Sequence, residues 1–397
     1  MARLRHMIEQ QKALQDSANL PKLSGLPATQ SHLLPGYADL SPVGLGEGID
    51  TGLPRFMVVF TPDGGYRLVP LDRRELLTGG AVTAISTSAT TGQAMTSLNI
   101  EHMDPQALLE HFRTLRKTLG ALDDIFGSRR VISTVGEQLG LLTELCKNAR
   151  GQLRIDLLKT GASYAEFASL HCSDMGNIQA ATYWIDRAME WAIEADDRNT
   201  VGYVLRRKSF QAAGARDAGR TIGLAQAAQR ENPLTARVRA LACLQEARGH
   251  ALDRNEAACQ RKIDEADELI TDGAHRDDIE SDLGYFCTKV HVEVHQAACW
   301  TELGHPQRAI GLFHQGLNAL PVTNYCNRGE YLSWQAHAHI ANNDPEQAVA
   351  VGQQSLAIVL ATGYNRAKNE LQRLAAKLAS WAELPAVRDF TQQLATL

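Results

Sequence analysis

Several features that would assign the chain to a simple class are missing from the sequence. No apolar run approaches the roughly 18 residues that a membrane-spanning helix needs, so no membrane segment is expected. The N-terminus is charged and no apolar stretch of a secretory signal follows it. The seven cysteines stand in helical segments without a CxxC pair, which indicates small core residues rather than a disulfide framework. These absences favour a reducing, cytoplasmic location.

An excess of positive charge is missing as well. The formal net charge is −5 and the pI is about 6.2, which argues against a broad nucleic-acid-binding surface. The glycine-rich segment at residues 44–48 lacks the GxGxxG spacing and follows no strand, so a phosphate-binding loop is not expected. No Ser–His–Asp order and no clustered carboxylate pair stands out. We therefore expect no catalytic residues and no cofactor.

Small residues recur at a fixed spacing, and this pattern organises the chain. A first small residue is followed by a second five positions later and a third seven positions after that. The three sets are Gly176, Ala181 and Ala188; Gly304, Ala309 and Gly316; and Asn343, Ala348 and Ser355. A polar turn follows the first residue of each set, and apolar helical patterns lie on both sides.

Helix-pair packing explains this spacing. Glycine or asparagine can end a helix with a positive φ angle, and the two later small residues let the next helix approach its neighbours closely. The pattern is that of the tetratricopeptide repeat (TPR), whose unit is about 34 residues. The sequence therefore predicts an all-α, TPR-like αα-superhelical solenoid of about five or six helix pairs.

Three segments are expected along the chain. Residues 1–54 contain five prolines and are expected to form a largely disordered arm or linker. Residues 55–100 hold a predicted β-hairpin, RFMVVF and YRLVPL around a Pro-Asp-Gly turn, and a linker. Residues 101–397 form the repeat domain. Within it, turns are predicted near Gly161, Gly249 and Gly273, with a longer loop after Gly249.

A succession of segments along the chain carries a resemblance to a known family. They are VPLDRRELL at 69–77, LDD at 122–124, LLTELCKNARGQLRIDLL at 141–158, SDMGNIQAATYWIDRAMEWAIEADD at 173–197, YVLRRKSFQA at 203–212 and LPAVRDFTQQL at 384–394. In this order they resemble a family of actinobacterial regulators in which a helix-turn-helix precedes a TPR-like region. The resemblance covers about residues 60–397.

The N-terminal region departs from that family. A helix-turn-helix of this type needs about 55–60 residues with an LAxxxGxS-like segment, and residues 1–54 contain no such segment. The resemblance implies a cytoplasmic regulator of transcription, in secondary metabolism or development. The departure implies that the DNA-binding module has been lost or lies in another protein, so that DNA is contacted only indirectly or through a partner. A longer upstream reading frame that restores the module is the alternative.

One stripe of residues is of the types that bind metals. Cys287, His291, His295 and Cys299 are each four residues apart. On one helix these four side chains would span about 18 Å, too far to share one ion. The simpler interpretation is that the cysteines pack in the core and the histidines line a helix face, so no metal site is expected.

Repeat positions indicate which residues face the inner groove. In a TPR, side chains about 13, 10, 6 and 2 residues before the turn residue face that groove. Counting back from Gly176, Gly304 and Asn343 gives these polar candidates: Glu166, Asp174, His291, Glu302, Glu330 and His337. An acidic groove with two histidines would suit a basic or amine-bearing peptide and could sense pH. The alternative is a solvated helix face.

Two further sets of side chains are assigned structural roles. The five tryptophans fall inside helical patterns and are expected in the core between repeats. The run Arg206-Arg207-Lys208 is expected at a solvated helix end, where cations suit the helix dipole. A contact with a phosphate backbone is the alternative for that run.

Two functions remain open from the sequence. In the first, the protein binds a peptide or protein partner in its groove and controls transcription. In the second, it is a TPR scaffold or adaptor without a direct transcriptional role. An enzyme is not expected; a metal bound at Cys287 and His291, or an organic cofactor, would reopen that option. Whether the chain forms a homodimer is also left open.

Overall fold

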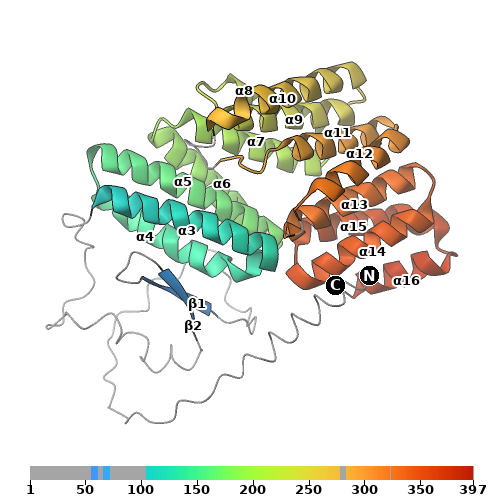
Figure 1. Ribbon diagram of the computed structural model, residues 1–397, viewed down its shortest axis with the longest axis horizontal. Helices are drawn as coiled ribbons and strands as arrows, with labels where there is room; N and C mark the ends of the chain where they lie inside the picture. Colours follow the sequence, from blue (N-terminus) through green and yellow to red (C-terminus); the bar gives the residue numbers. More distant parts are fainter. Residues whose placement is uncertain (1–54, 61–65, 72–103, 278–282, 322, 397) are drawn as a thin grey trace, which may run out of the picture. The chain divides into compact units, whose positions relative to one another are not determined.

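The computed structural model describes residues 55–60, 66–71, 104–277, 283–321 and 323–396 (Figure 1). The predicted arm at residues 1–54 and the linker after the hairpin lie outside these residues. Two strands, β1 (Arg55–Phe60) and β2 (Tyr66–Leu71), pair antiparallel, with Arg55 opposite Leu71 and Phe60 opposite Tyr66.

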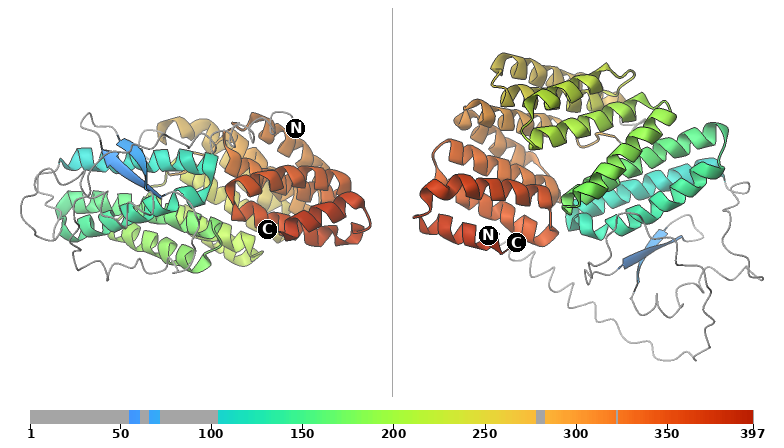
Figure 2. Two further views of the ribbon diagram at one scale, coloured as in Figure 1. Left: turned by 90° about the horizontal axis from the view of Figure 1, so that it is seen from below. Right: turned by 180° about the vertical axis from the view of Figure 1, so that it is seen from behind.

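All the other regular elements of the described residues are helical. They are α3 (Pro105–Phe126), η2 (Ser128–Arg130), α4 (Ile132–Asn148), α5 (Gly151–Asp174), α6 (Ile178–Glu194), α7 (Arg198–Gly214), α8 (Ala218–Arg230), α9 (Ala236–Leu252), α10 (Glu256–Asp277), α11 (Lys289–Leu303), α12 (Pro306–Ala319), α13 (Tyr325–Ala341), α14 (Pro345–Thr362), α15 (Asn365–Leu378), η3 (Ala379–Trp381) and α16 (Pro385–Ala395). Successive helices pack as pairs, α5 with α6, α7 with α8, α9 with α10, α11 with α12 and α13 with α14 (Figures 1 and 2). The predicted all-α helical repeat is confirmed.

Six of the turns between these helices share one geometry. Their turn residues have positive φ angles and are Gly176, Asp196, Arg216, Arg254, Gly304 and Asn343. In each turn the amide of the next residue donates to the carbonyl five positions earlier, as Asn177 N does to Cys172 O at 2.8 Å. This is the Schellman arrangement, which satisfies the last carbonyls of the helix. At five of the six turns that next residue is Asp or Asn, and its side chain caps the following helix.

The predicted small residues lie where helices approach closely. All the second and third members of the three sets are buried, and a Cβ atom at Gly316 would lie 2.5 Å from Val294 Cγ2. Thr221 and Ala228 follow the turn at Arg216 with the same spacing and are buried. Cys259 and Ala266 follow the turn at Arg254 in the same way. These two units are therefore as regular as the others.

Three predicted turns are wrong because the glycines lie inside helices, two of them where another helix approaches closely. Gly249 lies inside α9, where a Cβ atom would be 2.6 Å from Ile222 Cγ1. Gly161 lies inside α5, where a Cβ atom would be 2.8 Å from the Trp191 ring. Gly273 lies within α10. No longer loop follows Gly249, since the turn comes at Arg254.

Helices far apart in the sequence meet where the first and last repeats contact each other. α3 contacts α13 and α14, and α5 contacts α15. At Gly127, whose φ is 79°, an added Cβ atom would lie 2.2 Å from Thr362 O, so only glycine fits there. Cys326 Sγ donates to Asp123 O at 3.3 Å. These contacts bring residues of α3, α5, α13 and α15 to the same site.

The core contains the residue types that the sequence assigned to it. All seven cysteines are free and buried. Trp191, Trp300 and Trp334 are buried, and Trp184 and Trp381 pack partly buried against the core. Among the helices described here, none combines the length and apolar character needed to cross a bilayer.

Candidate ligand-binding pocket

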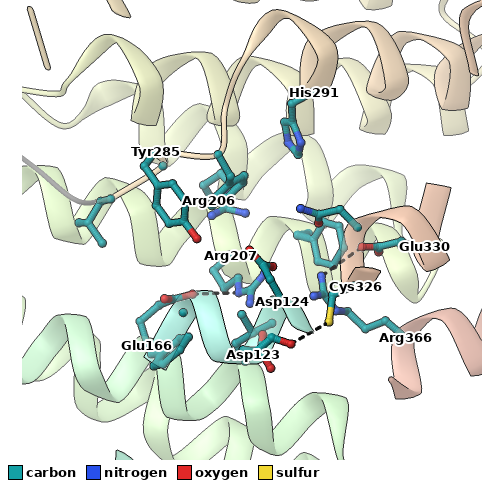
Figure 3. Close-up of a pocket in the computed structure, with 18 of the residues that line it drawn as sticks. Asp123, Asp124, Glu166, Arg206, Arg207, Tyr285, His291, Cys326, Glu330 and Arg366 are labelled. Atoms are coloured by element: carbon teal, nitrogen blue, oxygen red, sulfur yellow. Dashed lines mark hydrogen bonds and ion pairs between the residues drawn. The ribbon is translucent and has the colours of Figure 1, made fainter. Parts of the chain in front are cut away.

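A pocket with a volume of about 120 Å³ lies among the first helices of the pairs. Its walls come from α3, α5, α7, α9, α11, α13 and α15 and from residues 283–286 (Figure 3). Its ionisable side chains are Arg116, Asp123, Asp124, Glu166, Tyr203, Arg206, Arg207, Tyr285, His291, His295, Cys326, Glu330, Tyr331 and Arg366. Charged groups from helices distant in sequence therefore share one pocket.

The structure brings some of the predicted groove residues together and not others. Glu166, His291 and Glu330 line the pocket. Asp174 is buried beside it, where its Oδ1 accepts a hydrogen bond from Arg366 Nε at 2.7 Å.

Two predicted groove residues lie outside the pocket lining. Glu302 pairs with Arg216 at 2.8 Å. His337 lies against Glu370, with Nε2 3.4 Å from Oε2. Among the predicted residues, those that line the pocket stand 10 or 13 positions before the turn residue, whereas Asp174 and Glu302, 2 positions before it, and His337, 6 before it, do not.

The prediction of an acidic groove is wrong, because four guanidinium groups stand among its carboxylates. They belong to Arg116 of α3, Arg206 and Arg207 of α7, and Arg366 of α15. Arg206 and Arg207 were expected at a solvated helix end. They lie in the middle of α7 instead, only 3% and 8% exposed.

The sequence held a signal for Arg206. Counting back from Arg216 by about 13, 10 and 6 residues gives Tyr203, Arg206 and Phe210, and all three line the pocket. The signal was missed because arginine is not a residue type that marks a turn. Only the later spacing to Thr221 and Ala228 identifies Arg216 as a turn residue.

Two of the four arginines have acidic partners. Arg207 Nε lies 3.1 Å from Glu166 Oε1 in a buried ion pair between α7 and α5 (Figure 3). Arg366 donates from Nε to Asp174 and from Nη1 to Glu330 Oε2, the latter at 3.3 Å. Arg366 thus joins α5, α13 and α15 through two carboxylates.

The end of α3 contributes two carboxyl groups with altered acidity. Burial, with the neighbouring Asp174 charge, raises the pKa of Asp123 to about 7. Its Oδ1 accepts a hydrogen bond from Ser128 Oγ at 3.1 Å and lies 3.4 Å from His171 Nδ1. Burial raises the pKa of Asp124 to about 6. Both groups therefore hold their protons more tightly than an exposed aspartate.

The other two arginines have no acidic partner among the described residues. Nε and Nη2 of Arg206 are buried without a hydrogen-bond partner, and burial lowers the pKa of its guanidinium. Its Cζ lies 4.4 Å from the centre of the Tyr203 ring and 5.9 Å from that of Phe286. Arg116 Nε is likewise buried without a partner, and its Cζ lies 3.5 Å from the centre of the Phe167 ring. An uncompensated buried charge costs on the order of 3–5 kcal/mol.

The pocket contains two buried histidines, of which only His291 was among the predicted groove residues. His291 Nδ1 lies 2.7 Å from Tyr331 Oη, and the His295 ring packs edge-on against Trp334. Burial and the Arg206 charge lower the pKa of His291 to about 3, and burial lowers that of His295 well below its usual value. Both rings are neutral at physiological pH, so pH sensing by His291 is wrong. Within the part of the chain that is described, no three His, Cys, Asp or Glu side chains are placed to hold a metal ion.

No protein-family model matches the chain, and no curated protein matches it. One similar solved structure is described as "Crystal Structure of Rap Protein Complexed with Competence and Sporulation Factor". It has 13% sequence identity and a TM-score of 0.45, and the match covers 74% of this chain and 96% of that one.

Proposed function

We propose that this protein is a regulatory binding protein that takes a peptide, or a short segment of a partner protein, into the pocket and thereby acts on transcription. The observation that carries the proposal is the buried guanidinium of Arg206, which faces the pocket and has no acidic partner within the described residues. A ligand that supplies the missing contacts would offset the cost of that burial. Helical-repeat proteins commonly bind partners along this inner surface.

The walls of the pocket give such a ligand a way to act at a distance. Arg116 and Glu166 come from the first helices, and Glu330 and Arg366 come from the last ones. A ligand that contacts both sets favours the arrangement of the helices that it fits best. Binding would then shift the population between arrangements, and a second protein could recognise the difference.

The transcriptional part of the proposal is supported by the sequence resemblance to actinobacterial regulators with a TPR-like region. We propose that the contact with DNA is made indirectly or through a partner protein. A cytoplasmic location accords with the free, buried cysteines. The alternative function is a scaffold or adaptor whose pocket holds a partner without any effect on transcription.

The test compares pocket variants with a matched variant outside the pocket. Glu330→Gln and Arg206→Gln alter pocket side chains, whereas Glu302→Gln makes the same type of change in a surface ion pair. Each is introduced into the chromosomal gene of the native host, and RNA sequencing compares the strains with wild type and with a gene deletion. Native mass spectrometry of the purified proteins detects a bound peptide.

The two functions predict different results. If the protein is a regulator, both pocket variants change the transcripts that the deletion changes, and they lose the peptide that wild type and Glu302→Gln retain. If deletion leaves transcripts unchanged while the pocket still holds a peptide, the adaptor function takes its place. Transcript changes that are equal in all three variants would contradict a role for the pocket.

A further inference from the structure

The unpartnered nitrogens of Arg206 form one edge of the guanidinium group. Nε and Nη2 lie on the same side of the planar group, and both are buried without a hydrogen-bond partner. The rings of Tyr203 and Phe286 are both within cation–π distance of the guanidinium. A planar edge with two parallel N–H groups matches the two oxygens of a carboxylate.

The protein's own pocket carboxylates do not fill this position. Glu166 pairs with Arg207, and Glu330 pairs with Arg366 (Figure 3). Asp123 accepts its hydrogen bond from Ser128. Among the described residues, neither these groups nor Asp124, the fourth pocket carboxylate, lies within ion-pair distance of Arg206. Because no carboxylate of the described residues takes this position, a ligand can supply the complementary anion.

Two observations favour a carboxylate over a phosphate. Glu166 and Glu330 are already paired with Arg207 and Arg366, and Asp124 offsets one of the two remaining arginines. A singly charged group therefore balances the remaining positive charge, whereas a doubly charged one exceeds it. The volume of about 120 Å³ also suits a small planar group. Arg116, whose Nε has no partner, adds a second positive charge to the same pocket.

We infer that Arg206 binds a carboxylate of the ligand through Nε and Nη2, so that the peptide is selected for an acidic side chain or a free C-terminus at this position. The assignment of a peptide as the carrier of the carboxylate rests on the proposed function. This preference for an acidic group is the opposite of the preference for a basic peptide that the sequence predicts for an acidic groove.

Matched peptide libraries test the assignment on the full chain. Octapeptides carry one Glu or the isosteric Gln, and each set has either a free or an amidated C-terminus. The tagged protein captures peptides from each library, and mass spectrometry measures their enrichment. The comparison includes Arg206→Gln and, as the matched control, Arg220→Gln, which changes an exposed arginine on α8.

We expect wild type and Arg220→Gln to enrich peptides with a carboxylate at least about tenfold over their neutral counterparts, and Arg206→Gln to lose that preference. The set that is enriched, Glu or free C-terminus, identifies the source of the carboxylate. Capture of charged and neutral peptides alike, or a preference that survives in Arg206→Gln, would overturn the inference and leave the proposed function intact.

A second measurement separates failure of the inference from failure of the proposed function. Glutarate, a small dicarboxylate, is titrated against wild type and Arg206→Gln while the melting temperature is recorded. If no peptide is captured but glutarate stabilises only wild type, the carboxylate site stands and the peptide function is overturned. If neither peptide nor glutarate binds, both are overturned.

Discussion

Arg366 of α15 donates a hydrogen bond from Nε to Oδ1 of Asp174 at the end of α5, at 2.7 Å, although 192 residues separate them in the sequence. Asp174 is 1% exposed, and the same arginine also reaches Glu330 on α13. The pair therefore joins the first repeat to the last ones beside the pocket. Loss of this pair should therefore lower the free energy of unfolding of the whole helical region.

Replacing Arg366 with methionine is expected to lower the free energy of unfolding by about 3–5 kcal/mol, because Asp174 and Glu330 lose their buried counter-charge. Urea unfolding followed by circular dichroism measures the change. The control is Arg388→Met, since Arg388 is exposed and pairs at 3.9 Å with exposed Glu383; its effect should stay within about 0.5 kcal/mol. Equal effects of the two substitutions would show that the Arg366 contacts do not stabilise the fold.

Asp123 predicts a dependence of stability on pH. Its pKa is about 7 in the folded protein against an ordinary value of 3.8. At pH values between these two pKa values, the unfolded chain has released the proton that the folded chain retains. The free energy of unfolding therefore falls as the pH rises, and this loss of stability is complete above about pH 7. Asp123→Asn should remove this destabilisation and so raise the free energy of unfolding by roughly 2–4 kcal/mol at pH 8.

Urea unfolding at several pH values between 5 and 8 checks this prediction, with Asp389→Asn on the exposed face of α16 as the control. The slope of stability against pH should be shallower in Asp123→Asn and unchanged in the control. The groups around Asp123, namely Asp124, Asp174, His171 and Arg366, remain in both variants. An unchanged slope in Asp123→Asn would mean that another group causes the dependence.

The helical repeat could be predicted because its signals are local. Gly176, Gly304 and Asn343 are residue types that tolerate a positive φ angle, and the small residues after them are visible in the sequence. The turns at Arg216 and Arg254 have the same geometry without such a residue type. There the Schellman hydrogen bonds and the cap of the next helix stabilise the turn. The residue with the positive φ angle is an arginine, a type that does not predict a turn.

The pocket could be predicted only in part because its charges depend on contacts between distant helices. Repeat positions identified Glu166, His291 and Glu330. The partner of Glu330 is Arg366, a residue of the last repeat that no counting rule within one repeat connects to α13. The burial of Arg206 is also invisible locally, since a solvated helix end explains a basic run equally well.

Two glycines of one helix give a matched test of repeat packing. In α12, a Cβ atom at Gly316 would lie 2.5 Å from Val294 Cγ2, whereas a Cβ atom at Gly311 meets nothing within 4 Å. Gly316→Ala should therefore destabilise the protein by about 1–3 kcal/mol through overpacking. Gly311→Ala should stabilise it by about 0.5–1 kcal/mol, because alanine favours the helix. Thermal unfolding measures both, and shifts of the same sign would contradict the close approach of α12 and α11.

Arg206 gives the sharpest contrast between stability and binding. Arg206→Met keeps most of the side-chain volume and removes a buried charge that has no acidic partner in the described part of the chain. We expect the free energy of unfolding to rise by about 1–3 kcal/mol and the capture of carboxylate peptides to fall to background. If Arg206 had a purely structural role, this substitution would lower the free energy of unfolding. Urea unfolding and peptide capture on the same preparation therefore decide whether Arg206 destabilises the fold and binds a ligand.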